Sequence, residues 1–233
     1  MNSQIKNYFE KYADNKRKDS IRFVYDYIVK HDFKKLIEFG MSRISSLEGD
    51  FTILAAMMAK TMGLEFTSVE ISWSTVDKMN KWFNNSSNEI FNNDQGTIEL
   101  IHQDQYDYMK NYNGKPYQYV FLDGDDQNKH GAFQTLLDSK MLAPHALICI
   151  DDMVAQNWWG DNSYFKQAKE IVRIVNEDSR LTPLDAVEYS PPNEIQLKCR
   201  EYNKKYPIPD NTKVHPKGVR QFDWQIILEY KEI

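Results

Sequence analysis

The sequence predicts an α/β fold built on a doubly wound, mostly parallel sheet, and two observations support this prediction. Short apolar stretches with the composition of buried strands alternate with segments of helical periodicity along the chain. Two of the apolar stretches, within Lys115–Asp123 and Ala146–Asp152, also run directly into aspartates. Ligand sites of such sheets lie outside the carboxyl ends of the strands, so these aspartates would share one rim.

Length and composition limit the domain organisation. A chain of 233 residues with 41% hydrophobic residues fits one globular domain, or one domain with a helical extension. We expect the extension at residues 1–33 and the sheet domain at residues 34–233. Within the latter, residues 190–223 are too many for a plain hairpin and predict an insertion, either a substrate lid or a solvated loop.

Composition also disfavours several locations and partners. No apolar run approaches the roughly 20 residues that span a bilayer. The start lacks the apolar segment of a secretory signal and two cysteines argue against a disulfide framework, so a cytoplasmic location is expected. A net charge of −5 offers no general attraction for nucleic acid or an anionic membrane. We therefore expect a small-molecule partner, and the oligomeric state stays open, a homo-oligomer included.

The elements of the first half follow from apolar periodicity. Residues 4–31 have the pattern of two amphipathic helices, separated by the polar run Asp14–Ser20. Strands are then expected at Leu36–Phe39, Phe66–Ile71 and Thr97–His102, with helices at about Leu47–Met62 and around Val76–Phe83.

The second half continues the alternation. Its final strand alternates apolar and polar residues, which is typical of an antiparallel strand. The expected strands are Lys115–Asp123, Leu147–Asp151, Leu184–Tyr189 and Trp224–Tyr230, and the expected helices are His130–Leu142 and Tyr164–Asn176.

The aspartates that end two neighbouring strands indicate a cation site. Asp123, Asp151 and Asp152 would repel one another unless a cation or a proton joins them. No Lys or Arg lies between Asp123 and Asp126 or flanks the Asp151–Asp152 pair in the sequence. Hard oxygen ligands favour magnesium, calcium or manganese. The alternative is that each aspartate caps the helix or turn that follows its strand.

The first strand predicts a cofactor cradle. It ends at Gly40 and is followed by a loop and the N-terminus of a helix. An acidic residue at the end of the second strand, Glu70, would accept hydrogen bonds from a ribose diol. These features fit a dinucleotide or another adenosine compound.

Five short motifs carry a resemblance to a known family: Ile37–Gly40, Ser68–Glu70, His102–Asp104, Val120–Asp125 and Ile148–Asp152. In order and spacing the chain resembles class I S-adenosylmethionine-dependent methyltransferases, and among them the small metal-dependent O-methyltransferases. The resemblance covers about residues 34–189 and the final strand. It implies a Rossmann-like sheet of seven strands in which the last strand is antiparallel.

The resemblance also implies roles for individual residues. The implied cofactor-binding residues are Glu38, Gly40, Ser46, Glu70, Asp104 and Asp123, and the implied metal ligands are Asp123, Asp151 and Asp152. Asp123, Asp126 and His130 are the catalytic candidates. Related enzymes often have His or Lys where this chain has Asp126, and a second glycine where it has Ile44.

The function that the resemblance implies is methyl transfer from S-adenosylmethionine to a hydroxyl oxygen of a small molecule, such as a sugar, a phenol or another metabolite. A divalent cation, expected to be magnesium, would assist the methyl transfer. One alternative is an inactive, methyltransferase-like binding or scaffold protein. A nicotinamide-dependent dehydrogenase is disfavoured because no G-x-G-x-x-G fingerprint follows the first strand.

Overall fold

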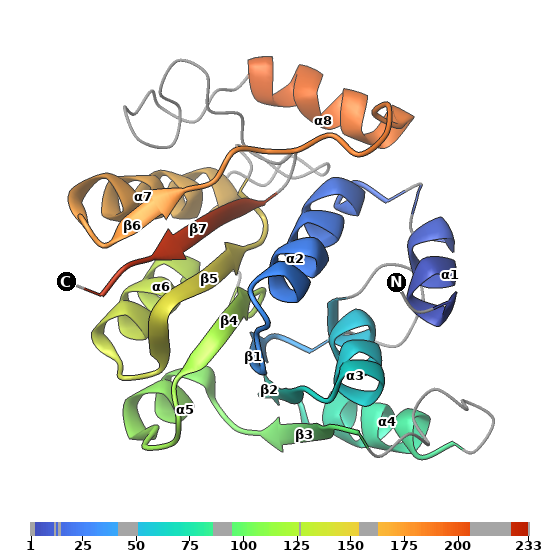
Figure 1. The fold of residues 1–233 in the computed structure, drawn as a ribbon. Helices are drawn as coiled ribbons and strands as arrows, with labels where there is room; N and C mark the ends of the chain where they lie inside the picture. Colours follow the sequence, from blue (N-terminus) through green and yellow to red (C-terminus); the bar gives the residue numbers. More distant parts are fainter. Residues whose placement is uncertain are drawn as a thin grey trace.

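A computed structural model describes residues 3–11, 13, 15–41, 51–85, 95–125, 127–153, 163–205 and 225–232. In this part of the chain seven strands form one sheet in the order β3-β2-β1-β4-β5-β7-β6 (Figure 1). The strand β7 runs antiparallel to both of its neighbours, and the other pairings are parallel. The predicted fold class is therefore confirmed. The strands are β1 (Lys35–Phe39), β2 (Glu65–Glu70), β3 (Thr97–His102), β4 (Tyr117–Leu122), β5 (Leu142–Ile150), β6 (Leu181–Pro183) and β7 (Ile226–Tyr230).

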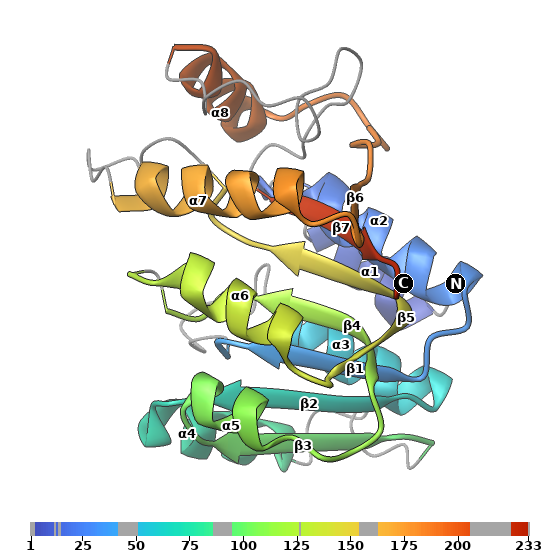
Figure 2. The ribbon, with the colours of Figure 1, turned by 90° about the vertical axis from the view of Figure 1, so that its left-hand side faces the viewer.

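Helices cover both faces of the sheet (Figures 1 and 2). One face packs against α1 (Ser3–Lys11), α2 (Lys18–Lys30), α3 (Phe51–Met62) and α4 (Trp73–Phe83). The other packs against α5 (Gln105–Asn111), α6 (Lys129–Asp138) and α7 (Ser163–Glu177). The helix α8 (Glu194–Lys205) lies beyond the β6 edge of the sheet (Figure 2).

The central strands are apolar on both faces because each face is covered by helices. Along β4, Tyr119 and Phe121 enter the core beneath α1–α4, whereas Val120 and Leu122 enter the core beneath α5–α7. All four side chains are at most 3% exposed. Continuous apolar strands of this kind explain why the sequence indicated a doubly wound sheet.

The first two helices join the main core. Ile5 of α1 and Ile21, Val24 and Ile28 of α2 are buried in one cluster with Leu54 of α3. The predicted pair of amphipathic helices is confirmed, and their apolar stripes pack on the same sheet face as α3 and α4.

Two expectations about individual elements are wrong. The predicted helix His130–Leu142 ends at Asp138, because β5 already begins at Leu142. The predicted strand Leu184–Tyr189 is instead β6, Leu181–Pro183, and it ends where Pro183 removes a backbone donor. Val187 and Tyr189 are about two-fifths exposed, at 39% and 43%, so their apolar character did not mark a buried strand.

Two helices were not predicted. The short α5 begins directly after Asp104, and α8 occupies the first part of the presumed loop at residues 190–223. Residues 206–224 of that insertion lie outside the described residues. Among the described residues, no helix is both long enough and apolar enough to cross a membrane.

Gly40 allows the ends of β1 and β4 to approach each other. Its φ is +94°, and a Cβ atom there would lie 2.6 Å from the Gly124 amide nitrogen. We expect Gly40→Ala to lower the free energy of unfolding by about 2–4 kcal/mol, because left-handed strain and a backbone clash add together. Urea unfolding followed by circular dichroism measures this.

Gly63→Ala is the matched control for this prediction. Gly63 also has a positive φ, +72°, but its Cβ would meet only the Gln95 carbonyl oxygen, at 3.3 Å. Strain alone should cost about 1–2 kcal/mol there. Equal losses in the two variants would contradict the role given to the close approach at Gly40.

Candidate active site

The residues that follow four parallel strands lie on one edge of the sheet. The strand pairings place Phe39 opposite both Val69 and Leu122, and Leu122 opposite Ile150. Gly40 and Glu70 therefore meet Asp123 and Asp151 at the carboxyl edge, where ligands of open α/β sheets bind. This edge is the candidate active site.

Asp123, Asp151 and Asp152 come together as expected. Each offers one carboxylate oxygen, and these oxygens lie within 4.8 Å of one another. The sheet positions them through backbone hydrogen bonds: the amide of Asp123 donates to the Phe39 carbonyl at 2.9 Å, and that of Asp151 to the Leu122 carbonyl at 3.0 Å. We call these three residues the acid cluster.

Arg17, which directly precedes α2, pairs with the acid cluster. Its Nε donates to Asp151 Oδ1 at 2.9 Å, and its Nη2 donates to Asp151 Oδ2 in a close contact. The same Nη2 lies 3.8 Å from Asp152 Oδ1. Gln225, just before β7, adds a bond from Nε2 to Asp151 Oδ1 at 3.0 Å. The buried Asp151 carboxylate is thus held by a two-pronged guanidinium and an amide.

Lys129 is the second cation at the acid cluster. It is the first residue of α6 and its side chain is only 3% exposed. Its Nζ lies 3.2 Å from Asp152 Oδ2, 3.8 Å from Asp123 Oδ1 and 3.3 Å from the Asp151 carbonyl oxygen. The buried ammonium of Lys129 therefore lies between Asp152 and Asp123, the two aspartates that make the weaker contacts with Arg17.

The charge of the acid cluster is unevenly compensated. Burial opposes ionisation of Asp151, but Arg17 and then Lys129 hold the pKa of its carboxyl well below the usual range. Burial and the neighbouring Asp151 instead raise the pKa of Asp123 well above its usual range. Burial and the adjacent Arg17 lower the pKa of Lys16 to about 8.

Sequence reasoning missed Arg17, Lys129 and Gln225. No Lys or Arg flanks the acid cluster along the chain, yet the fold brings two to it. Arg17 lies 134 positions before Asp151, in a polar stretch whose sequence predicts only a connection between helices. Lys129 carried a weak signal, because it opens the helix that follows the fourth strand.

Glu70 connects Met41, which follows Gly40, to Ser72 at the start of α4. Its carboxylate accepts hydrogen bonds from the amides of Met41 at 3.1 Å and Ser72 at 2.7 Å. Beside it, the apolar side chains of Ile71 and Trp73 are 67% and 63% exposed. A carboxylate flanked by exposed apolar groups suits a ligand with both hydroxyls and a flat ring.

Glu38 and Asp104 have structural partners at this edge. Glu38 is 1% exposed, and its Oε2 accepts from Thr52 Oγ1 at 2.6 Å and Ser68 Oγ at 2.8 Å. Asp104 caps α5 by accepting from the amides of Tyr106 and Asp107, at 2.8 and 3.1 Å. Cofactor binding by Glu38 and Asp104 stays a prediction.

The remaining predicted residues are less defined. His130 Nδ1 lies 2.5 Å from Gln167 Oε1, so its ring bridges α6 and α7. Its role as a general base stays a prediction. Ser46, Asp126 and the Ile44 position lie outside the described residues.

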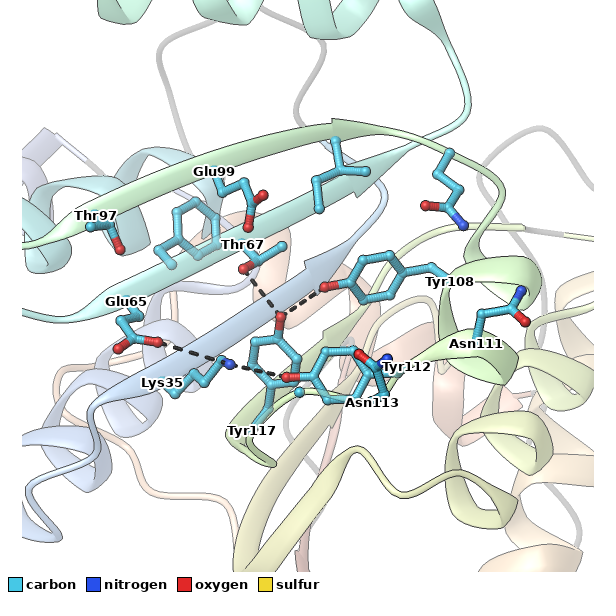
Figure 3. A pocket seen from close by; sticks show the side chains of 14 residues that line it. Lys35, Glu65, Thr67, Thr97, Glu99, Tyr108, Asn111, Tyr112, Asn113 and Tyr117 are labelled. Carbon is cyan, nitrogen blue, oxygen red and sulfur yellow. Dashed lines mark hydrogen bonds and ion pairs between the residues drawn. The ribbon is translucent and has the colours of Figure 1, made fainter.

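A separate cavity of about 400 Å³ lies on the α5 side of the sheet (Figure 3). Lys35, Glu65 and Thr97 line it at the starts of β1–β3, and Glu99, Ile101 and Gln103 continue its lining along β3 to the carboxyl end of that strand. Its tyrosines bond within the cavity wall: Tyr117 Oη lies 2.9 Å from Tyr108 Oη and 3.2 Å from Thr67 Oγ1. Among the described residues, none that lines this cavity is one of the predicted site residues.

Comparison with known proteins shows which solved structures share this fold. No protein-family model and no curated protein matches the sequence. Among solved structures, an O-methyltransferase from Bacillus cereus in complex with SAH is 18% identical, with a TM-score of 0.56, over 99% of this chain and 92% of that one.

Two further structures are similar. SAH-bound PaMTH1 from Podospora anserina, a methyltransferase, is 13% identical, with a TM-score of 0.57, over 100% of this chain and 89% of that one. The O-methyltransferase TomG from Streptomyces achromogenes, in complex with SAM, is 12% identical, with a TM-score of 0.55, over 91% of this chain and 80% of that one. The chain thus has the fold of class I S-adenosylmethionine-dependent methyltransferases and resembles the small O-methyltransferases among them.

Proposed function

We propose that the chain transfers the methyl group of S-adenosylmethionine to a hydroxyl oxygen of a small molecule, such as a sugar, a phenol or another metabolite. One observation carries the proposal: Glu70 and the acid cluster share the carboxyl edge of a sheet with the strand order β3-β2-β1-β4-β5-β7-β6. Structures of this fold include proteins bound to SAM and to SAH.

The cofactor would lie over the ends of β1, β2 and β3. Glu70 would accept hydrogen bonds from the ribose hydroxyls, and the exposed side chain of Ile71 would cover one face of the adenine. Gly40 lets the backbone approach closely, and Ser46, Glu38 and Asp104 complete the proposed cradle. Asp123 borders both the cofactor and the acceptor.

Methyl transfer requires mainly that the site aligns the two reactants. Methyl transfer from a sulfonium cation to an oxygen anion neutralises charge, so a polar site gains little by stabilising new charge and much by orienting the two reactants. The acceptor hydroxyl must lose its proton near the transition state. Asp126 and His130 are the proposed proton acceptors, and Asp123 would help to position the hydroxyl.

The acid cluster fits a divalent cation by its donor set. Three carboxylates within 4.8 Å offer hard oxygen ligands. We propose Asp123, Asp151 and Asp152 as the ligands, with magnesium as the metal. A bound divalent cation would lower the pKa of an acceptor hydroxyl and orient it.

The cofactor half of the proposal is tested by Glu70→Ala. We expect this change to weaken binding of S-adenosylhomocysteine by about 10–150-fold, because charged hydrogen bonds of about 1.5–3 kcal/mol are lost. Isothermal titration calorimetry on both proteins measures the affinities.

Asp77→Ala is the control for that experiment. Asp77 lies on α4 near Glu70, and its carboxylate pairs with Lys81 at 2.7 Å. Its removal should leave cofactor affinity within about threefold, below roughly 0.7 kcal/mol. If the unaltered chain did not bind S-adenosylhomocysteine, the proposed cofactor would be wrong, and a different ligand on this fold would be favoured.

The metal half is tested by chelation. With a chelator present, formation of S-adenosylhomocysteine over a panel of hydroxyl acceptors should cease, and added magnesium should restore it. Asp152→Asn should lower turnover at limiting magnesium by about tenfold or more, because one charged ligand is lost. Asp152 suits this test better than Asp151, because removal of the Asp151 carboxylate would leave Arg17 without the partner of its two hydrogen bonds. Full turnover by metal-free protein would remove the cation from the proposal and leave methyl transfer standing.

A further inference from the structure

Arg17 occupies the ligand atoms that a metal at the acid cluster would need. Asp151 Oδ1 accepts from Arg17 Nε at 2.9 Å and from Gln225 Nε2 at 3.0 Å, which uses both lone pairs of that oxygen. Asp151 Oδ2 accepts from Arg17 Nη2. Asp151 is fully buried, so its carboxylate has little freedom to turn toward a second cation.

A divalent cation and the Arg17 guanidinium cannot share this carboxylate at full contact. Direct coordination of Asp151 would replace at least one of the two bonds from Arg17. The guanidinium would then face a doubly charged neighbour across a few ångströms, at a site shielded from water, where like charges repel strongly. Nη2 also lies 3.8 Å from Asp152 Oδ1, so the conflict extends to a second proposed ligand.

We propose that Arg17 is an intramolecular competitor of the divalent cation at Asp151: the guanidinium neutralises the acid cluster when metal is absent, and metal loading moves the Arg17 side chain off it. This inference rests on the metal site of the proposed function. It adds that the helical segment before the sheet domain controls the affinity of that site.

The backbone around Arg17 is fixed, so the exchange involves the side chain. The Arg17 amide donates to Asn15 Oδ1 at 2.9 Å, and its carbonyl accepts from the Ile21 amide at 2.9 Å and from Ser20 Oγ at 2.9 Å. The side chain is 18% exposed, which leaves a route toward solvent. Arginine is long and stays charged in water, so it can leave without changing its protonation state.

Lys129 behaves differently at the same cluster. It is a compact point charge that approaches one oxygen each of Asp152 and Asp123, at 3.2 and 3.8 Å, and it does not bind a carboxylate through two prongs. Its side chain is 3% exposed. Because Lys129 contacts Asp151 through the carbonyl oxygen, at 3.3 Å, we assign the competition for the Asp151 carboxylate to Arg17.

The decisive experiment is calorimetric titration of the full chain with Mn²⁺ and with Mg²⁺, without cofactor or acceptor. Arg17→Gln should bind Mn²⁺ at least about tenfold more tightly than the unaltered chain, because the competitor is gone. Arg17→Lys keeps the charge but loses the planar fork, so it should gain less. It also serves if Arg17→Gln does not fold.

Lys16→Gln is the matched control for a general effect of charge. Lys16 is adjacent in sequence, and its charge acts on the same two aspartates, Asp151 and Asp152. If Arg17 competes by direct contact, Lys16→Gln should gain less than about threefold. Equal gains for the two Gln variants would overturn the inference and leave a uniform electrostatic effect.

A spectroscopic readout follows the side chain itself. In ¹⁵N spectra, the Nε–H signal of Arg17, assigned by its loss in Arg17→Lys, should be slow to exchange in metal-free protein and should shift or broaden on saturation with Mg²⁺. An unchanged Arg17 signal at saturating metal would overturn the inference. So would the absence of metal binding in every variant, while methyl transfer in the presence of chelator separately decides the proposed function.

Discussion

The carboxylate of Asp151 is fully buried at the end of β5, and an ionised carboxylate at such a position needs positive charge and hydrogen-bond donors beside it. Arg17 and Gln225 supply them from opposite ends of the chain. Removing one partner of such a buried pair typically costs about 3–5 kcal/mol, because the other charge is stranded. The start of α2, the end of β5 and the start of β7 are therefore held in one arrangement by a single side chain.

The two halves of the candidate site depend on a second constraint, the close approach of β1 and β4. Gly40 has no side chain to hold the Gly124 backbone away, so the end of β1 lies against the start of the acid cluster. Glu70 fastens the other side of the same loop through the Met41 amide. The ends of β1 and β4 thus meet at the carboxyl edge without a side chain between Gly40 and Gly124.

Local sequence patterns predicted the parts of this molecule that depend on neighbouring residues. The third strand was predicted at Thr97–His102, as observed, because apolar residues and turn signals bound it closely. The meeting of Asp123 with Asp151 followed from a general property of parallel sheets. By contrast, the prediction of a strand at Leu184–Tyr189 is wrong, because the apolar side chains of Val187 and Tyr189 are exposed there.

The features that local sequence patterns did not predict depend on contacts between residues far apart in the sequence. Nothing around Arg17 in the sequence shows that its partner lies beyond β5, and a polar connection between helices usually faces water. The same holds for α8, whose Gln196 donates to the buried Asp19 of α2 at 2.9 Å. Sequence periodicity reports which face of an element is buried, but it does not report which distant side chain will neutralise a buried charge.

The separation of these partners has a consequence for how the molecule is assembled. Arg17 is synthesised before Asp151 and Gln225 after it, so the buried carboxylate lacks one of its partners until residue 225 has been added. Contacts between such distant positions close long loops and form slowly. The sheet can form around its central strands first, and the neutralised acid cluster would then be among the last features to reach its final form.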